Sequence, residues 1–119
     1  MKLTNSDIKL LIAVGAQNGR WCDPMTIVRQ IGRGTFMSVC GGRWTVISDL
    51  EHGEVGIVLL CGSNRAVEVV LDYNDTYSVR RRRMITSGVH KGDTEIEYSV
   101  SGIYCDDLGE IVHKAGHWK

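Results

Sequence analysis

The chain has 119 residues, 43% of them hydrophobic, which is enough for one compact domain with a buried core. Its formal net charge is zero at pH 7, so a globally basic nucleic-acid-binding protein is not expected, whereas a local basic patch is compatible with this composition. No stretch of the sequence approaches the roughly 18 apolar residues of a membrane-spanning helix, and no secretory signal pattern is recognisable, so we expect a soluble intracellular protein without membrane contact.

Two helices are predicted in the N-terminal part of the chain. A capping-box pattern and an apolar stripe predict the first helix over about residues 5–17. Asp23 followed by Pro24 predicts the start of a second helix, because aspartate is a favoured cap and proline a favoured first residue. Gly32 can end this second, short helix.

Beyond the second helix, the hydrophobic pattern changes to alternation, which is typical of strands. The segment at residues 55–60 is apolar throughout, so we expect it in the centre of the sheet. Glycine-rich and aspartate-rich turns separate the candidate strands. These strands cover residues 35–39, 43–48, 55–60, 66–71, 77–85 and 94–100.

The last predicted element is a short amphipathic helix over residues 104–116. Acidic residues in its first turn and basic residues in its last turn complement the helix dipole, and Gly116 can close it. We therefore predict an α+β fold: a single antiparallel, meander-like sheet of five or six strands, with N-terminal helices and a C-terminal helix packed on one face. The apolar stripe of the last helix consists of Cys105, Leu108, Ile111, Val112 and Ala115.

The most conspicuous charged feature is a run of four arginines in the strand at residues 77–85. Such a run could bind phosphates and so serve a small nucleic-acid-binding module. In a strand, however, alternate residues point to opposite faces, and cross-strand carboxylates can neutralise them. The run is Arg80, Arg81, Arg82 and Arg83, and we expect Glu68 opposite Arg80, with Glu95 and Glu97 beside Arg80 and Arg82.

A hairpin that joins the strands at residues 66–71 and 77–83 fixes which residues of the two strands lie opposite one another. A turn at residues 72–75 places Leu71 opposite Tyr77 and Val69 opposite Val79. Arg81 then shares the apolar face, so its head must emerge at the sheet rim, pass the C-terminal helix, or find a partner. We take Arg81 and Arg83 as candidates for an interaction surface.

Neither the histidines nor the cysteines predict a catalytic or metal site. His113 and His117 are four residues apart, but we expect Gly116 to end the helix before His117 and so to separate them. The cysteines lack any paired spacing and are expected to be free and mostly buried, including Cys105 in the apolar stripe. No catalytic residues, metal site or cofactor are predicted. The cysteines are Cys22, Cys40, Cys61 and Cys105.

Several segments resemble a group of small proteins encoded by tailed phages and prophages. They are IGRGTFMSVCGGRW, AVEVVLDYNDTYSVRRRRM and SGIYCDDLGEIVHKAG, which span about residues 25–116. The resemblance implies an α+β core there, preceded by a helical extension over residues 1–24 within the single domain 1–119. The arginine run departs from the family pattern. The matching residues are Phe36, Asp75, Thr76, Tyr77, Ile103, Tyr104, Asp107 and Leu108.

The resemblance implies a non-enzymatic accessory protein in the cytoplasm of a bacterial host. Small phage proteins of this kind often bind a host or defence-system macromolecule, as anti-CRISPR proteins do, and an inhibitor of a bacterial immune complex is therefore expected. A nucleic-acid-binding module and a structural or assembly protein are the alternatives. The chain is expected to be a monomer or a homodimer formed through sheet edges. The expected partner-binding residues are Arg81, Arg83 and Trp118.

Overall fold

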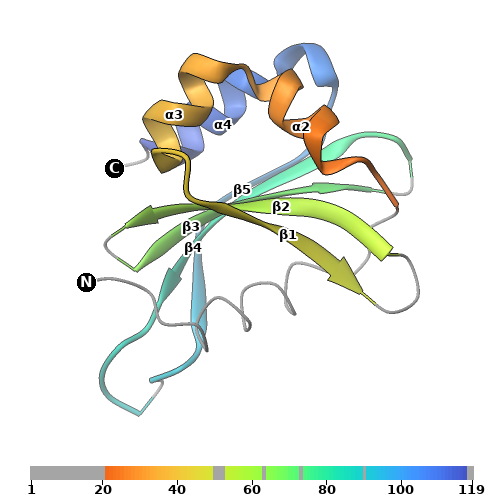
Figure 1. The fold of residues 1–119 in the computed structure, drawn as a ribbon. Helices are drawn as coiled ribbons and strands as arrows, with labels where there is room; N and C mark the ends of the chain where they lie inside the picture. The colour runs from red at the N-terminus through yellow and green to blue at the C-terminus, as the bar shows by residue number, and fades with distance from the viewer. Residues whose placement is uncertain (1–20, 50–52, 63, 73, 90, 118–119) are drawn as a thin grey trace.

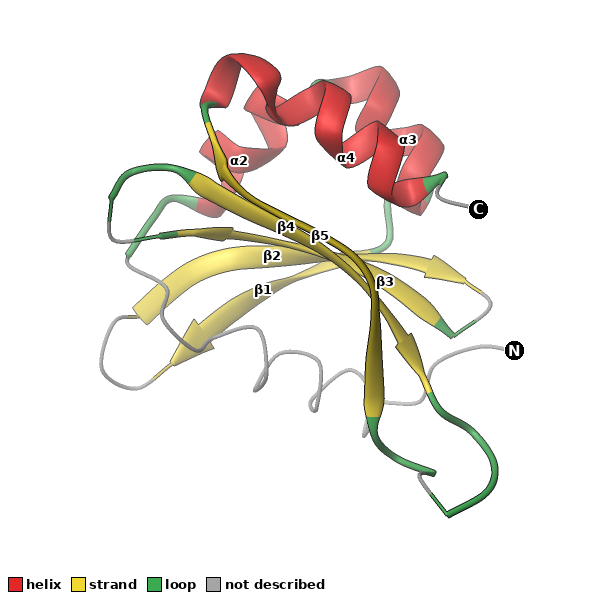
Figure 2. Cartoon of the chain, turned by 180° about the vertical axis from the view of Figure 1, so that it is seen from behind, coloured by secondary structure: helices red, strands yellow, loops and turns green. Residues whose placement is uncertain are grey.

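The computed structural model describes residues 21–49, 53–62, 64–72, 74–89 and 91–117 (Figure 1). They form a five-stranded sheet whose spatial order follows the chain, and each neighbouring pair of strands is antiparallel. The described helices lie together over one face of this sheet, as the view from behind also shows (Figure 2). The strands are β1 (Trp44–Asp49), β2 (Gly53–Gly62), β3 (Arg65–Leu71), β4 (Tyr77–Met84) and β5 (Thr94–Ile103).

This arrangement confirms the α+β class and the meander-like antiparallel sheet predicted from the sequence. The predicted helix over residues 5–17 and the candidate Trp118 lie outside the described residues.

Helix α2 (Pro24–Ile31) begins and ends as its flanking residues predict. The Asp23 side chain accepts a hydrogen bond from the backbone nitrogen of Met25 at 3.0 Å, and Pro24 occupies the first turn. Gly32 ends the helix with a φ of 91°, a value that favours glycine. The chain can therefore reverse sharply at this residue.

The strand predicted at residues 35–39 is wrong, because helix α3 (Arg33–Cys40) occupies this segment. Its buried side chains, Phe36, Val39 and Cys40, are three and four residues apart, which is the spacing of one helical face. Gly32 serves as the N-cap of α3 as well as the C-cap of α2, so the second helix starts at once. The short apolar segment was compatible with both periods, and packing favours the helix.

The predicted C-terminal helix is present, but its first turn is the 3₁₀ turn η1 (Cys105–Asp107), followed by α4 (Leu108–Gly116). Leu108, Val112 and Ala115 are buried as expected, whereas Cys105 is exposed. The prediction that Cys105 is buried is therefore wrong. The tighter 3₁₀ turn shifts its side chain out of phase with the α-helical stripe.

The helices pack closely on one another. A Cβ atom at Gly109 of α4 would lie 2.6 Å from the carbonyl oxygen of Ile31 at the end of α2. At Gly116, a Cβ atom would lie 2.6 Å from Cγ2 of Val39 in α3. These two glycines allow α4 to approach both neighbouring helices, which fixes the helical layer against the sheet.

The central strands of the sheet are buried on both faces. The main core lies between the helices and the sheet and includes Ile57, Leu59, Val69 and Val79 at zero exposure. On the opposite face a second cluster is also buried, and its members are Ile47, Val55, Val58, Ala66 and Val70. The near-continuous apolar sequence of β2 follows from this burial, because its side chains contribute to both clusters.

Candidate interaction surface and the arginine network

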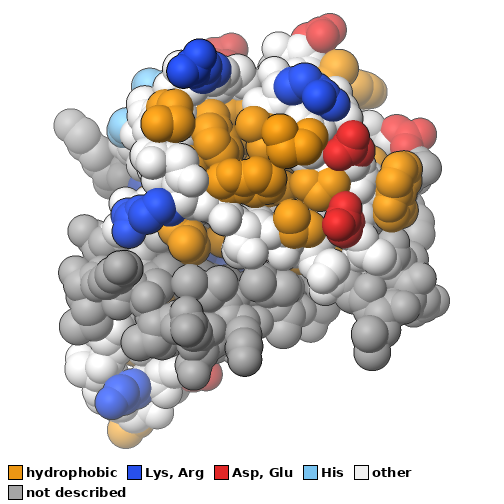
Figure 3. Space-filling view, in the orientation of Figure 1, with side chains coloured by type: hydrophobic (Ala, Val, Ile, Leu, Met, Phe, Trp, Pro, Cys, Tyr) orange, Lys and Arg blue, Asp and Glu red, His pale blue; other side chains and the backbone are white. Residues whose placement is uncertain are grey.

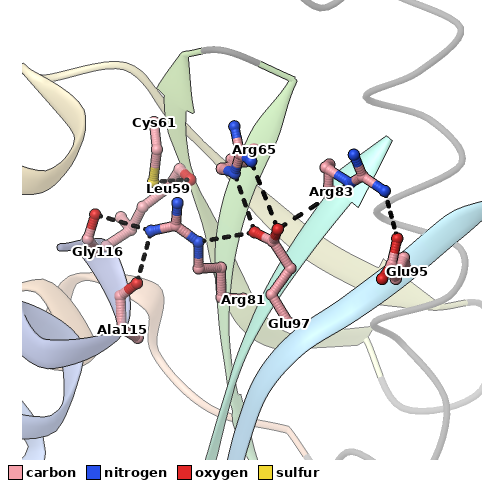
Figure 4. Close-up of polar contacts among 9 residues, drawn as sticks. All are labelled: Leu59, Cys61, Arg65, Arg81, Arg83, Glu95, Glu97, Ala115 and Gly116. Carbon is pink, nitrogen blue, oxygen red and sulfur yellow. Dashed lines mark hydrogen bonds and ion pairs between the residues drawn. The ribbon is translucent and has the colours of Figure 1, made fainter. Parts of the chain in front are cut away.

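The predicted register of the β3–β4 hairpin is confirmed. Leu71 lies opposite Tyr77, and Glu68 lies opposite Arg80. The four arginines consequently alternate between the two faces of the sheet. Arg81 and Arg83 project on the helix side, together with Arg65 and Glu97 (Figure 4).

Arg81 is part of the interior of the protein. Its residue exposure is 9%, and its Nη1 donates to the carbonyl oxygens of Ala115 at 2.9 Å and Gly116 at 3.0 Å. Its Nε donates to Glu97 Oε1 at 3.0 Å. The arginine therefore links β4, β5 and the end of α4 (Figure 4). The sequence expectation that its head passes the C-terminal helix or finds a partner agrees with this geometry.

Glu97 is the shared acceptor of this network. Arg65 Nε donates to the same Oε1 atom at 2.9 Å, and Arg83 Nε lies 4.0 Å from Oε2. Burial alone would raise the pKa of Glu97, but hydrogen bonds from Arg65 and Arg81 outweigh it and hold the pKa below its usual value. The carboxylate is thus ionised wherever the protein is folded near neutral pH.

Arg83 is the most exposed of the four arginines. Its side chain is 43% exposed and donates to Glu95 across the β4–β5 ladder. Hydrogen bonding to Glu95 raises the pKa of Arg83, so it is a permanent cation held by a neighbouring anion. As a candidate interaction residue it is accessible but already paired.

On the opposite face, Glu68 pairs with both of the other arginines. Its Oε1 accepts hydrogen bonds from Arg80 at 3.0 Å and from Arg82 at 2.9 Å, and Glu68 is only 2% exposed. Arg82 also donates to the Thr94 hydroxyl at 3.1 Å. A buried carboxylate between two guanidinium groups offsets part of the cost of burying these charges.

The expectation that Glu95 and Glu97 lie beside Arg80 and Arg82 is wrong, since they pair with Arg83 and Arg81. A register shift between Arg81 and Arg82 separates the pairs Arg81–Tyr98 and Arg82–Ile96, leaving Glu97 as the extra residue. This bulge turns Glu97 toward the helix side, where it meets Arg81.

Exposed apolar side chains lie on the helical layer. Figure 3 shows hydrophobic side chains gathered over α2, α3 and β1. Trp21, Met25 and Met37 are 63%, 46% and 50% exposed, and Val28 and Trp44 are partly buried beside the core. We call these five residues the α2–α3–β1 patch.

An aromatic contact and a backbone hydrogen bond connect this patch to the rest of the fold. The ring of Trp44 meets Phe36 edge to face, with centroids 6.0 Å apart. The backbone nitrogen of Cys22, next to Trp21, donates to Glu54 at 2.8 Å and ties the segment before α2 to β2. The patch also borders β1, which is an edge strand of the sheet. It combines exposed methionine and tryptophan side chains with an edge strand of the described sheet.

Sequence reasoning missed this surface. The strand predicted over residues 35–39 includes Met37. With residues 33–40 helical, Met37 lies one position after the buried Phe36 and therefore points away from the core. A helix predicted over residues 33–40 would have placed Met37 on the side that faces away from the core.

Two kinds of feature are absent from the described part of the chain. Within it, no group of three or more histidine, cysteine, aspartate or glutamate side chains comes together as a metal site. Nor does any described helix have the length and apolar character to cross a membrane. No family model, curated protein or solved structure matches the chain.

Proposed function

We propose that this protein is a non-enzymatic accessory protein of phage or prophage type that binds a host or defence-system macromolecule, as an inhibitor of a bacterial immune complex. The sequence resemblance supports the origin, and the α2–α3–β1 patch supports binding as the mode of action. Methionine and tryptophan are enriched at protein interfaces, where methionine adapts to irregular surfaces and tryptophan anchors contacts. The exposure of Trp21, Met25 and Met37 is the observation that carries this proposal.

The arginine run gives less support to the nucleic-acid-binding alternative. The guanidinium groups of Arg80, Arg81, Arg82 and Arg83 all donate to carboxylates of the chain itself. A phosphate would have to displace these acids.

The helical layer also differs from a helix-turn-helix motif. Gly32 alone joins α2 to α3, whereas such motifs use a turn of roughly three or four residues. Helix α3 contains one charged residue, Arg33, which is too little for a recognition helix that contacts phosphates along its length.

The test is affinity capture of host-lysate proteins by the full chain after nuclease treatment. The patch variant carries Met25→Ser and Met37→Ser, and the matched control carries Val89→Ser and Ile96→Ser, two hydrophobic residues that are also exposed but lie elsewhere. We expect a stoichiometric protein that the wild type and the control retain and the patch variant loses.

Three outcomes would contradict the proposal. Equal capture by both variants would remove the patch as the binding surface. Loss of all captured material on nuclease treatment would favour nucleic acid. Assembly of the purified chain into large particles, without a captured protein, would favour the structural or assembly role.

A further inference from the structure

Two histidines meet at the C-terminal end of α4. The backbone nitrogen of His117 donates to the carbonyl oxygen of His113 at 3.1 Å, so the helical hydrogen-bond pattern continues through Gly116 to His117. Both side chains consequently lie on one side of the helix, and their ring centroids are 4.5 Å apart. The sequence expectation that Gly116 separates them is wrong. Both residues are exposed.

A neighbouring hydroxyl orients one of the rings. Ser38 Oγ donates to the carbonyl oxygen of Thr35 at 3.1 Å, which uses its single proton. It also lies 3.4 Å from Nε2 of His117. In its Nε2–H tautomer the ring can donate to this hydroxyl, and that tautomer keeps a lone pair on Nδ1 for a metal ion. Histidines that bind metals commonly use their second nitrogen in this way.

The surrounding charges leave space for a cation. Lys114 directs its ammonium group over the Tyr98 ring, 5.9 Å from the centroid. The Arg81 guanidinium faces the sheet, where Glu97 compensates it, and occupies the carbonyl oxygens of Ala115 and Gly116. An ion at this end would thus be held by the two imidazoles.

We propose that His113 and His117 form a two-imidazole site for a borderline divalent metal ion such as Zn²⁺. Two zinc–nitrogen bonds of about 2.0–2.1 Å at a tetrahedral angle place imidazole centroids roughly 5 Å apart, close to the spacing here. Exposed side chains adjust on the nanosecond scale, so both lone pairs can turn to one ion. The remaining coordination positions face solvent.

The experiment is a calorimetric titration of the untagged full chain with ZnCl₂, because a polyhistidine tag would itself bind the ion. All proteins carry Cys105→Ser, since Cys105 is the exposed thiol and could compete for zinc. We expect saturable binding that weakens more than about tenfold in His113→Asn and in His117→Asn. A His52→Asn/His90→Asn double variant, which keeps only the proposed pair, should bind like the parent.

The Ser38→Ala variant tests whether the Ser38 hydroxyl helps to position His117 for zinc binding. Loss of the Nε2–H acceptor should weaken zinc binding by up to about tenfold, because such supporting contacts tune metal affinity. No saturable zinc binding by the parent would overturn the proposal. Unchanged binding in His113→Asn/His117→Asn would overturn it too. Circular dichroism of each variant confirms that the exposed substitutions leave the fold intact.

Discussion

Arg81 Nη1 lies 2.9 Å from the carbonyl oxygen of Ala115, so a strand of the sheet caps the end of a helix. The last carbonyl groups of a helix have no partner within the helix, and a cation near them is favoured by the helix dipole. Arg81 meets both needs, while Glu97 balances its charge. Arg81, within the run of arginines, therefore has a structural role in the fold.

Replacing Arg81 by methionine should destabilise the protein strongly. The variant keeps an apolar stem but loses the bonds to Ala115 and Gly116 and leaves Glu97 with fewer partners. Removing one partner of a buried ion pair costs about 3–5 kcal/mol. We expect a decrease in the free energy of unfolding at the lower end of that range, measured by urea denaturation at pH 7.

Arg83→Gln is the matched control for this experiment. Arg83 lies two residues along the same strand and the same face, but its pair with Glu95 is exposed. We expect little change in stability. Equal destabilisation by Arg81→Met and Arg83→Gln would contradict the capping role of Arg81.

Acidification should reduce the stability of the folded protein because Glu97 becomes protonated. Although burial opposes it, hydrogen bonding to Arg65 and Arg81 lowers the pKa of Glu97 in the folded protein, so the unfolded chain binds the proton more readily. The contribution of Glu97 is therefore complete above the unfolded pKa of about 4.3 and disappears as the pH falls through the lower folded pKa. Urea denaturation between about pH 7 and pH 3 should show a smaller loss of stability in Glu97→Gln than in the wild type. Parallel profiles would refute this assignment.

A methyl group at Gly56 should disrupt the sheet. An ideal Cβ there would overlap the backbone carbonyl oxygen of Val69 and lie 3.0 Å from Cα of Val70, and backbone atoms of a paired strand cannot easily move away. We expect Gly56→Ala to reduce the free energy of unfolding by about 3 kcal/mol or more. Thermal denaturation followed by circular dichroism measures the effect.

In contrast to Gly56→Ala, we expect Gly34→Ala to increase the stability of the protein. Gly34 lies within α3, and nothing lies within 4 Å of a Cβ built there. Alanine should stabilise the helix by about 0.5–1 kcal/mol. If both alanine variants changed stability in the same direction, local packing would not explain either.

The cysteines should differ sharply in reactivity. Cys22 is buried, and burial, with the nearby Glu54, raises the pKa of its thiol to about 11; burial likewise raises the pKa of Cys61 to about 11. Cys105 is exposed and free. Because the thiolate is the reactive form, a disulfide reagent at about pH 8 should label Cys105 first and the others only on unfolding. Rapid labelling that survives in Cys105→Ser would contradict this prediction.

Local patterns were sufficient to predict much of the fold. Asp23 and Pro24 begin α2 and Gly32 ends it, as their chemistry predicts. The hairpin register followed from the turn at residues 72–75, which also places Glu68 opposite Arg80. These features depend on neighbours in sequence or on a single turn. They could therefore be read without tertiary information.

Features set by distant packing could not be predicted in the same way. Residues 33–40 are helical because Phe36 and Val39 face a core formed by other elements. The partners of Arg81 depend on a bulge in β5 and on the position of α4. The α2–α3–β1 patch became visible only once α3 was known to be a helix.

The order of strands along the chain has a consequence for how the sheet assembles. Each strand pairs with its sequence neighbour, and the β3–β4 ladder is the only one among the described strands without a register shift. Pairings between neighbours close short loops and give a low contact order, which favours rapid folding. We expect the central hairpin to form early and the outer strands to add on either side. Mutational effects on refolding rates that are larger at Val69 and Val79 than at Ile47 would show this sequence of events.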